Sequence, residues 1–147
     1  MLRLNRVAAE VLQDLDVRGA TDITGFGLLG HGAEMVEASG AGLRIHASRL
    51  PLLDGALALA EKGLLSGGMK RNRRYLESTL GAKGQLVIDT AISPGLISLL
   101  FESETSGGLL FSVPSERADG VIESFRKRGE PCWEIGEVTP EPAIRVA

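Results

Sequence analysis

Residues 19–35, GATDITGFGLLGHGAEM, constrain the fold more than any other part of the sequence. The stretch begins with a short apolar–polar alternation that carries one carboxylate, Asp22. It then passes through Thr24, Gly25 and Gly27 into a predicted helix. Thr24 is predicted to be the N-cap, because its hydroxyl can accept a hydrogen bond from an amide one turn into the helix. The two glycines allow another group to approach the backbone closely at this helix start.

This helix start can bind an anion. The first amides of a helix lack partners within the helix, and the helix dipole places positive charge there. A carboxylate two residues earlier would repel the anion unless a divalent cation lay between them. We therefore hypothesise a metal–phosphate site around Asp22. The local pattern leaves a second interpretation open, in which Asp22 caps a turn and the glycines serve close packing.

Composition excludes several classes of protein. The 147 residues suffice for one domain with a sizeable core. A net charge of −3 and an aromatic content of 4% argue against a nucleic-acid partner. The sequence has no apolar run long enough to span a membrane and no targeting pattern after Met1. Its single cysteine, Cys132, excludes an internal disulfide and favours a reducing, cytoplasmic location.

Hydrophobic periodicity predicts alternating helices and strands. The predicted helices cover residues 3–16, 25–39, 51–62 and 115–128, with another that starts at Ser93–Pro94. The predicted strands cover residues 42–47, 85–89, 109–113, 132–138 and 143–146. Residues 67–74 are predicted to form a glycine turn followed by a basic cluster. The expected fold is an α/β (α+β) layered domain with a mixed sheet, in which the last two strands form a hairpin.

Three motifs indicate a family. The segment TDITGFGLLGH at 21–31, preceded by LNRVAAEVLQ at 4–13, closely resembles the C-terminal domain of selenophosphate synthetase (selenide, water dikinase). SGGMKRN at 66–72 and TSGGLLFSVP at 105–114 fall where that family has its glycine motifs, and IGEV at 135–138 resembles its closing strand. The first motif is the specific one. Aminoimidazole ribonucleotide synthetase, thiamine monophosphate kinase and a hydrogenase maturation factor share the others.

The resemblance implies a domain organisation and an activity. Residues 1–147 would form the C-terminal domain, with the fold of the aminoimidazole ribonucleotide synthetase C-terminal domain. The N-terminal ATP-binding and catalytic domain would be absent from this chain. Members of the family make selenophosphate, AMP and phosphate from ATP, selenide and water, and they usually form homodimers. No catalytic residue is expected in this chain, so it should not turn over alone. The alternatives are a sister enzyme of the same superfamily and a stand-alone binding domain.

The resemblance also assigns site residues. By its position in the motif, Asp22 is the expected Mg²⁺ ligand, with ATP as the bound substrate. The expected nucleotide-facing residues, for which a purely structural role stays open, are Thr24, Gly25, Thr105, Ser106, Gly107 and Gly108. The family form AspProGln is replaced here by Glu102, Ser103 and Glu104. That departure weakens any transfer of contacts to these three positions.

Four further features carry expectations of their own. His31 is expected to be a core or interface histidine with one backbone hydrogen bond, with catalysis as the alternative. Asn72 is expected to fix its loop through side-chain to backbone bonds. Cys132 is expected to be a buried, inert thiol within a strand. The basic cluster is either a solvated face or a polyphosphate contact, and it consists of Lys70, Arg71, Arg73 and Arg74.

Overall fold

The computed structural model describes residues 4–147, so Arg3, the first residue of the predicted 3–16 helix, lies outside the described residues. The helices are α1 (Arg6–Asp14), α2 (Gly27–Ser39), α3 (Ala56–Glu61), α4 (Gly67–Leu76), α5 (Pro94–Leu100) and α6 (Ala118–Lys127). The strands are β1 (Gly19–Asp22), β2 (Gly42–Ile45), β3 (Leu86–Ile88), β4 (Leu109–Ser112), β5 (Gly136–Thr139) and β6 (Ile144–Val146). Short turns of other helix types are η1 (Ala47–Arg49), η2 (Glu77–Gly81) and η3 (Ser115–Arg117).

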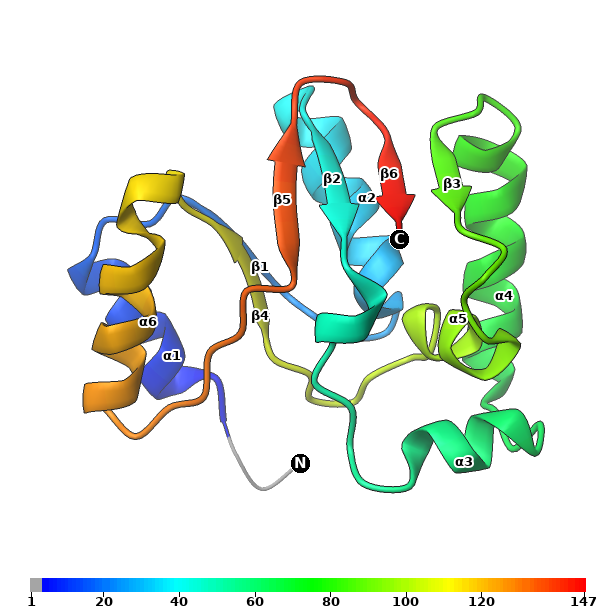
Figure 1. The fold of residues 1–147 in the computed structure, drawn as a ribbon, viewed down its shortest axis with the longest axis horizontal. Coiled ribbons are helices and arrows are strands. Elements are labelled where there is room, and N and C mark those ends of the chain that lie inside the picture. The colour runs from blue at the N-terminus through cyan, green and yellow to red at the C-terminus, as the bar shows by residue number, and fades with distance from the viewer. Residues whose placement is uncertain (1–3) are drawn as a thin grey trace.

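The strands form two sheets (Figure 1). β1 and β4 make an antiparallel ribbon, and a four-stranded sheet has the order β3-β6-β2-β5. β2 is antiparallel to β5 and parallel to β6, which confirms the predicted mixed sheet. The predicted hairpin of the last two strands is wrong, because β2 lies between them. The connection crosses over the start of β2 at Gly42, where a side chain would overlap the carbonyl oxygen of Glu141.

The structure tests the predicted ends of the helices. Ser93 Oγ accepts from the Leu96 amide at 3.3 Å with Pro94 at the first helical position, as predicted. α2 ends at Gly40 in the left-handed conformation, also as predicted. The predicted 51–62 helix begins only at Ala56, because Gly55 has φ +78° and interrupts helical geometry before it. β1 has no counterpart among the predicted strands.

Residues 67–74 form most of helix α4, so the predicted glycine turn is wrong. Ser66 caps this helix, and its hydroxyl accepts from the Met69 amide at 3.1 Å. The side chain of Met69 is buried in the core. The cap and the core contact outweigh the low helix propensity of the two glycines.

Two apolar clusters hold the elements together. The larger one lies between α2, the four-stranded sheet, α4 and α5, and its fully buried side chains are Leu29, Leu100, Phe101 and Ile144. The smaller one joins α1 to α6, and Phe111 of β4 stacks on Phe125 there with ring centroids 5.5 Å apart. In Figure 1 the β1–β4 ribbon runs between the α1–α6 pair and the four-stranded sheet. The ribbon is therefore anchored by core contacts from both directions.

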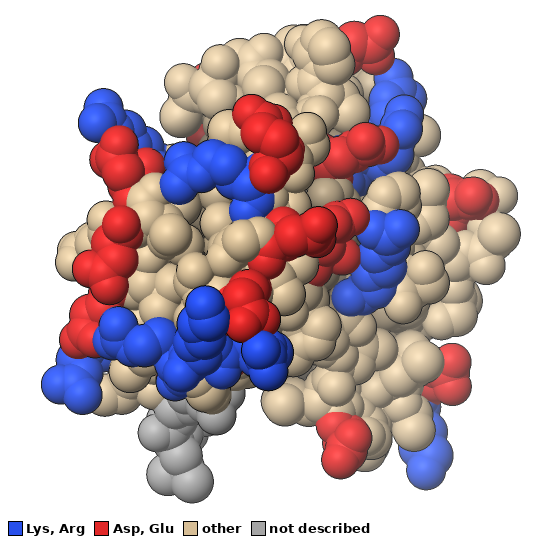
Figure 2. Space-filling view, turned by 60° about the vertical axis from the view of Figure 1, so that its left-hand side comes forward, with Lys and Arg blue, Asp and Glu red and all other residues tan. Residues whose placement is uncertain are grey.

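Charges of both signs alternate on the face that Figure 2 shows. On α1 and α6, Arg128 bonds Glu10 at 2.7 Å, and Arg126 bonds Glu123 at 2.7 Å. The hydrogen bond from Arg126 holds the pKa of the Glu123 carboxyl below its ordinary value. Such exposed pairs add little stability, and the face has no field of one sign. Within residues 4–147, no helix is long and apolar enough to cross a membrane.

Candidate functional site

The end of the β1–β4 ribbon brings two predicted groups of site residues together. Asp22 is the register partner of Leu109, the last pair of the ribbon. The pairing continues, because the Ile23 amide donates to the Gly108 carbonyl at 2.9 Å and the Gly107 amide donates to the Ile23 carbonyl at 3.1 Å. Residues 22–25 and 105–108, which are far apart in the sequence, therefore lie side by side.

Asp22 is exposed at this ribbon end. Within the part of the chain that the structure describes, its carboxylate makes no hydrogen bond or ion pair, so it caps no turn there. It lines a hollow of about 430 Å³ whose other walls include Leu12 of α1 and Leu109 of β4. No group of three or more His, Cys, Asp or Glu side chains that could hold a metal occurs among residues 4–147. Asp22 is thus an exposed carboxylate that is available to a ligand.

Thr24 does not cap α2, so the predicted N-cap is wrong. The helix begins at Gly27, which has φ +71°, and its N-cap position is Phe26 without a side-chain bond. The left-handed Gly27 breaks the helical path, so the helix starts later than expected. The Thr24 carbonyl accepts from the amides of Gly27 at 3.1 Å and Glu104 at 2.9 Å. Its hydroxyl lies 3.1 Å from Nε2 of His31 instead.

His31 lies in the interior of the protein, with 7% of its surface exposed. Its Nδ1 is 2.9 Å from Oε2 of Glu34, one turn further along α2, and its ring centroid is 5.6 Å from that of Phe26. The expected core location is confirmed. The expected single backbone bond is wrong, because both ring nitrogens bond to side chains. The spacing of His31 and Glu34, three residues apart on a helix, is a sequence signal for this pair.

Asn72 of α4 makes the predicted side-chain to backbone bonds, but they fix the turn before α2 and not its own segment, which is helical. Its Nδ2 donates to the carbonyl oxygens of Gly25 at 2.9 Å and Phe101 at 3.0 Å. Ser103 Oγ also donates to the Gly25 carbonyl, at 2.8 Å. These bonds hold the Gly25 carbonyl toward the protein. A side chain added at Gly25 would meet no atom within 4 Å, so the other side of this turn is open.

Replacing Asn72 with alanine should lower the free energy of unfolding by about 1–3 kcal/mol, because the partly buried Phe101 carbonyl loses its donor and the Gly25 carbonyl keeps only Ser103. Urea unfolding followed by circular dichroism measures this change. Asn5→Ala is the matched control, since Asn5 is at the N-cap of α1 but makes no side-chain cap bond. Its effect should stay within about 0.5 kcal/mol. Equal losses in the two variants would contradict the role given to Asn72.

Glu102 has a role that the sequence did not reveal. Both oxygens of its carboxylate accept from the Ser66 amide at 3.3 Å, at the N-terminus of α4. A carboxylate is favourable there because of the helix dipole. The amide of the N-cap residue Ser66 is therefore bonded within the protein, and its acceptor Glu102 is one of the positions where this sequence departs from the family form.

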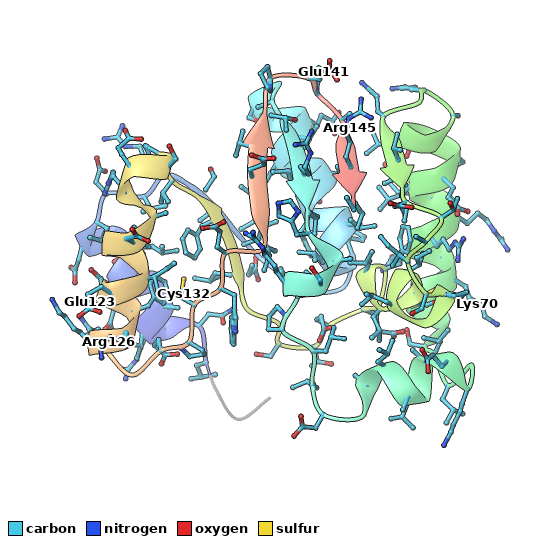
Figure 3. All side chains as sticks on the ribbon, in the orientation of Figure 1. Lys70, Glu123, Arg126, Cys132, Glu141 and Arg145 are labelled. Carbon is cyan, nitrogen blue, oxygen red and sulfur yellow. The ribbon has the colours of Figure 1, made fainter. Side chains whose placement is uncertain are left out.

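The basic cluster lies along α4 and not on the 105–108 loop. Arg73 bonds Glu77 at 2.8 Å, and its guanidinium lies 5.8 Å from the centre of the Phe101 ring. Figure 3 shows Lys70 extending from the outer side of α4, away from the β1–β4 ribbon. The solvated-face interpretation suits this placement of Lys70 and Arg73 better than a phosphate contact.

Cys132 packs at the edge of the α1–α6 cluster (Figure 3). It lies outside any strand, so the predicted 132–138 strand is wrong at this end, and only β5 forms. Burial raises the pKa of its thiol above the ordinary value. A higher pKa leaves less thiolate at neutral pH, and the thiolate is the nucleophilic form. The half-buried thiol is therefore poorly suited to nucleophilic chemistry.

Comparison with known proteins places these features in a family. The family model "AIR synthase related protein, C-terminal domain" matches residues 1–147. The chain is 42% identical to a selenide, water dikinase of Pelobacter propionicus, over 99% of this chain and 40% of that protein. It is 41% identical to one of Caldanaerobacter subterraneus, over 87% of this chain and 35% of that protein. The chain thus spans well under half the length of these curated relatives.

Solved structures share the fold. E. coli HypE, a hydrogenase maturation protein, matches with a TM-score of 0.56 at 22% identity, over 94% of this chain and 34% of that chain. Thiamine-monophosphate kinase from Stenotrophomonas maltophilia matches with a TM-score of 0.53 at 15% identity, over 88% of this chain and 31% of that chain. These likenesses agree with the predicted α/β class. The match of the family model over residues 1–147 shows that the chain belongs to the family of AIR synthase related protein C-terminal domains.

Proposed function

We propose that this chain acts as the C-terminal domain of an ATP-dependent selenide phosphotransferase, which makes selenophosphate, AMP and phosphate from ATP, selenide and water. The observation that carries the proposal is the position of the exposed Asp22, unpaired among the described residues, next to the 105–108 segment, to which the backbone pairs at one ribbon end. The names of the curated relatives support the choice of reaction. Under this proposal, residues 1–147 close over the ATP phosphates that another domain binds.

Asp22 would supply one ligand to Mg²⁺. Its carboxylate is exposed and unpaired among residues 4–147, which suits a hard cation that prefers oxygen ligands. Mg²⁺ typically takes one or two carboxylates together with phosphate oxygens and water. Asp22 would therefore be the one Mg²⁺ ligand that this chain supplies, and the other ligands would come from the partner domain and ATP. The bound ion would neutralise charge on the transferring phosphoryl oxygens.

The 105–108 loop would face the phosphates. Thr105, Ser106 and Gly108 are exposed, and within the described residues the amides of Thr105 and Ser106 donate to no acceptor. Gly107 is used differently, because its amide holds the loop against Ile23. Free amides beside a carboxylate-bound cation suit a phosphate that bridges the two. Thr24 and Gly25, in the turn after β1, would border this space on its other side.

The remaining parts of the enzyme are proposed to lie outside this chain. We assign no catalytic residue here, because the thiol of Cys132 is half-buried and its pKa is raised. The nucleophile and most ATP contacts would belong to an N-terminal domain, and the assembled enzyme would be a cytoplasmic homodimer. A reducing compartment suits a chain with one free cysteine.

A chimera tests the proposal. This chain would replace the matching C-terminal segment of the Pelobacter propionicus enzyme, to which it is 42% identical. We expect the chimera to form AMP from ATP only when selenide is present, while this chain alone forms none. A folded chimera that ignores selenide would contradict the proposal. Activity with thiamine monophosphate or an aminoimidazole ribonucleotide precursor would instead favour a sister enzyme.

The gene offers an independent check. Reading the genomic sequence immediately upstream of Met1 should reveal an in-frame glycine-rich segment with cysteine or selenocysteine and a lysine. A stop codon directly before Met1 would favour a stand-alone binding domain.

A further inference from the structure

A chain of three side chains leads from the proposed site into helix α2. Thr24 Oγ1 lies 3.1 Å from His31 Nε2, and His31 Nδ1 lies 2.9 Å from Glu34 Oε2. The histidine is buried, whereas 56% of the Glu34 side chain is exposed. Thr24 lies two residues after Asp22, and its backbone carbonyl bonds the Glu104 amide beside the 105–108 loop. The three side chains therefore connect the surface of α2 to the ribbon end.

For a neutral His31, these contacts fix the direction of each hydrogen bond. An ionised carboxylate can only accept, so Nδ1 of His31 must carry the hydrogen that Glu34 receives. In a neutral imidazole the other nitrogen is then an acceptor. Nε2 can form its 3.1 Å contact only if the Thr24 hydroxyl donates to it. The hydroxyl hydrogen consequently points into the protein, and the lone pairs of Thr24 Oγ1 remain available on the other side.

We propose that His31, oriented by Glu34, is a positioning residue that holds the Thr24 hydroxyl as a hydrogen-bond acceptor for a water molecule on the divalent cation at Asp22. This inference rests on the proposed function and refines it. A hydroxyl held in this way cannot donate to a phosphate oxygen, so the Thr24 side chain belongs to the cation side of the site. The phosphate contacts are left to the backbone amides of the 105–108 loop.

The distances allow this arrangement. The ribbon pairing continues from Asp22 through Ile23, so the chain there is extended and the Cα atoms of Asp22 and Thr24 are separated by about 7 Å. Mg²⁺ lies about 2 Å from a ligand oxygen, and a hydrogen bond between oxygens adds about 2.8 Å. A carboxylate, the ion, one of its waters and the threonine hydroxyl fit this span. Hydrogen bonds of this kind orient the ligands of a metal, and their loss typically weakens binding about 10- to 100-fold.

The first test measures the histidine tautomer by long-range ¹H–¹⁵N correlation spectroscopy of this chain. Only His31 and His46 contribute signals, and a His46→Gln variant assigns them. We expect a protonated Nδ1 and an unprotonated Nε2 at His31. A hydrogen on Nε2 would overturn the proposal, because Thr24 would then be the acceptor. This measurement uses no enzyme activity, so it is independent of whether the proposed reaction is correct.

The second test measures cation binding, with Mn²⁺ as a paramagnetic probe that broadens amide signals near its site. We expect broadening around Ile23 and Ser106 in the unaltered chain, and an apparent Kd about 10-fold higher in Thr24→Val and His31→Leu. Thr24→Ser keeps the hydroxyl and should bind as the unaltered chain does. His31→Gln offers an amide oxygen to the hydroxyl and should recover part of the loss.

The outcomes separate this inference from the proposed function. Unchanged Mn²⁺ binding in Thr24→Val, with binding lost in Asp22→Asn, would overturn the role of Thr24 and His31 but leave the metal site intact. Absence of Mn²⁺ broadening in the unaltered chain, both alone and within the chimera with ATP, would overturn both the metal assignment and this inference. If a His31 variant fails to fold, the tautomer measurement on the unaltered chain still decides the question.

Discussion

Replacing Asp22 with asparagine should lower magnesium-dependent ATP consumption by the chimera at least about 100-fold. Asparagine keeps the size of the side chain but loses its negative charge, so a hard cation loses an ionic ligand. Coupled measurement of AMP formation gives the rate, and Mn²⁺ broadening of this chain should disappear in the same variant. The fold should be unaffected, because the Asp22 carboxylate makes no hydrogen bond or ion pair among residues 4–147.

Asp54→Asn is the matched control for this substitution. Asp54 is also exposed, but it lies in the turn before α3, in a different part of the fold. It should change neither the rate nor Mn²⁺ broadening. Near-normal turnover in Asp22→Asn would contradict the assignment of Asp22 as a metal ligand. An equal loss of turnover in Asp54→Asn would indicate a general effect of charge.

Replacing Gly107 with alanine should separate the loop from the ribbon. An added Cβ would overlap the carbonyl oxygen of Ile23 and lie 3.1 Å from the Ile23 Cβ. The loop would have to move, and the hydrogen bond from the Gly107 amide to Ile23 would break. We expect a loss of about 1–3 kcal/mol in unfolding free energy. Because displaced contacts of about 1 Å can cost 100-fold in rate, ATP consumption by the chimera should fall by about that factor.

Gly108→Ala provides the control for stability. No atom would lie within 4 Å of a Cβ at this position, so the substitution should be tolerated. Urea unfolding of the two variants makes the comparison within one loop. Equal stability of the two variants would show that the close approach of Gly107 to Ile23 is not required.

Much of the fold could be predicted from short-range patterns. The Ser93 cap and the Gly40 stop were found, because a cap bonds within its own turn and a left-handed residue favours glycine. Residues 67–74 were predicted wrongly, because the glycines indicate a turn while Ser66 and the buried Met69 stabilise a helix. Local propensity was overruled there by capping and core packing.

The residues of the candidate site could be predicted from the sequence, but their arrangement in space could not. Asp22 and the 105–108 loop followed from the motifs, whereas their adjacency depends on β1 pairing with β4. Thr24 was predicted to cap α2, and its bond to His31 appears only once the turn at Gly25 is folded. The sequence did not reveal that Glu102 accepts from the Ser66 amide, because Ser66 belongs to a distant segment of the chain.

The sequence by itself determined the helices with strong periodicity, their local caps, the α/β class and the family motifs. These features depend on interactions within a few residues, which a linear pattern records. Tertiary structure alone decided that β2 lies between β5 and β6, that the Thr24 hydroxyl bonds His31, and that Asp22 meets the 105–108 loop. Those outcomes depend on which distant segments pack against one another in the core. Strand neighbours and buried hydrogen-bond partners come from different parts of the sequence, so a local pattern does not specify them.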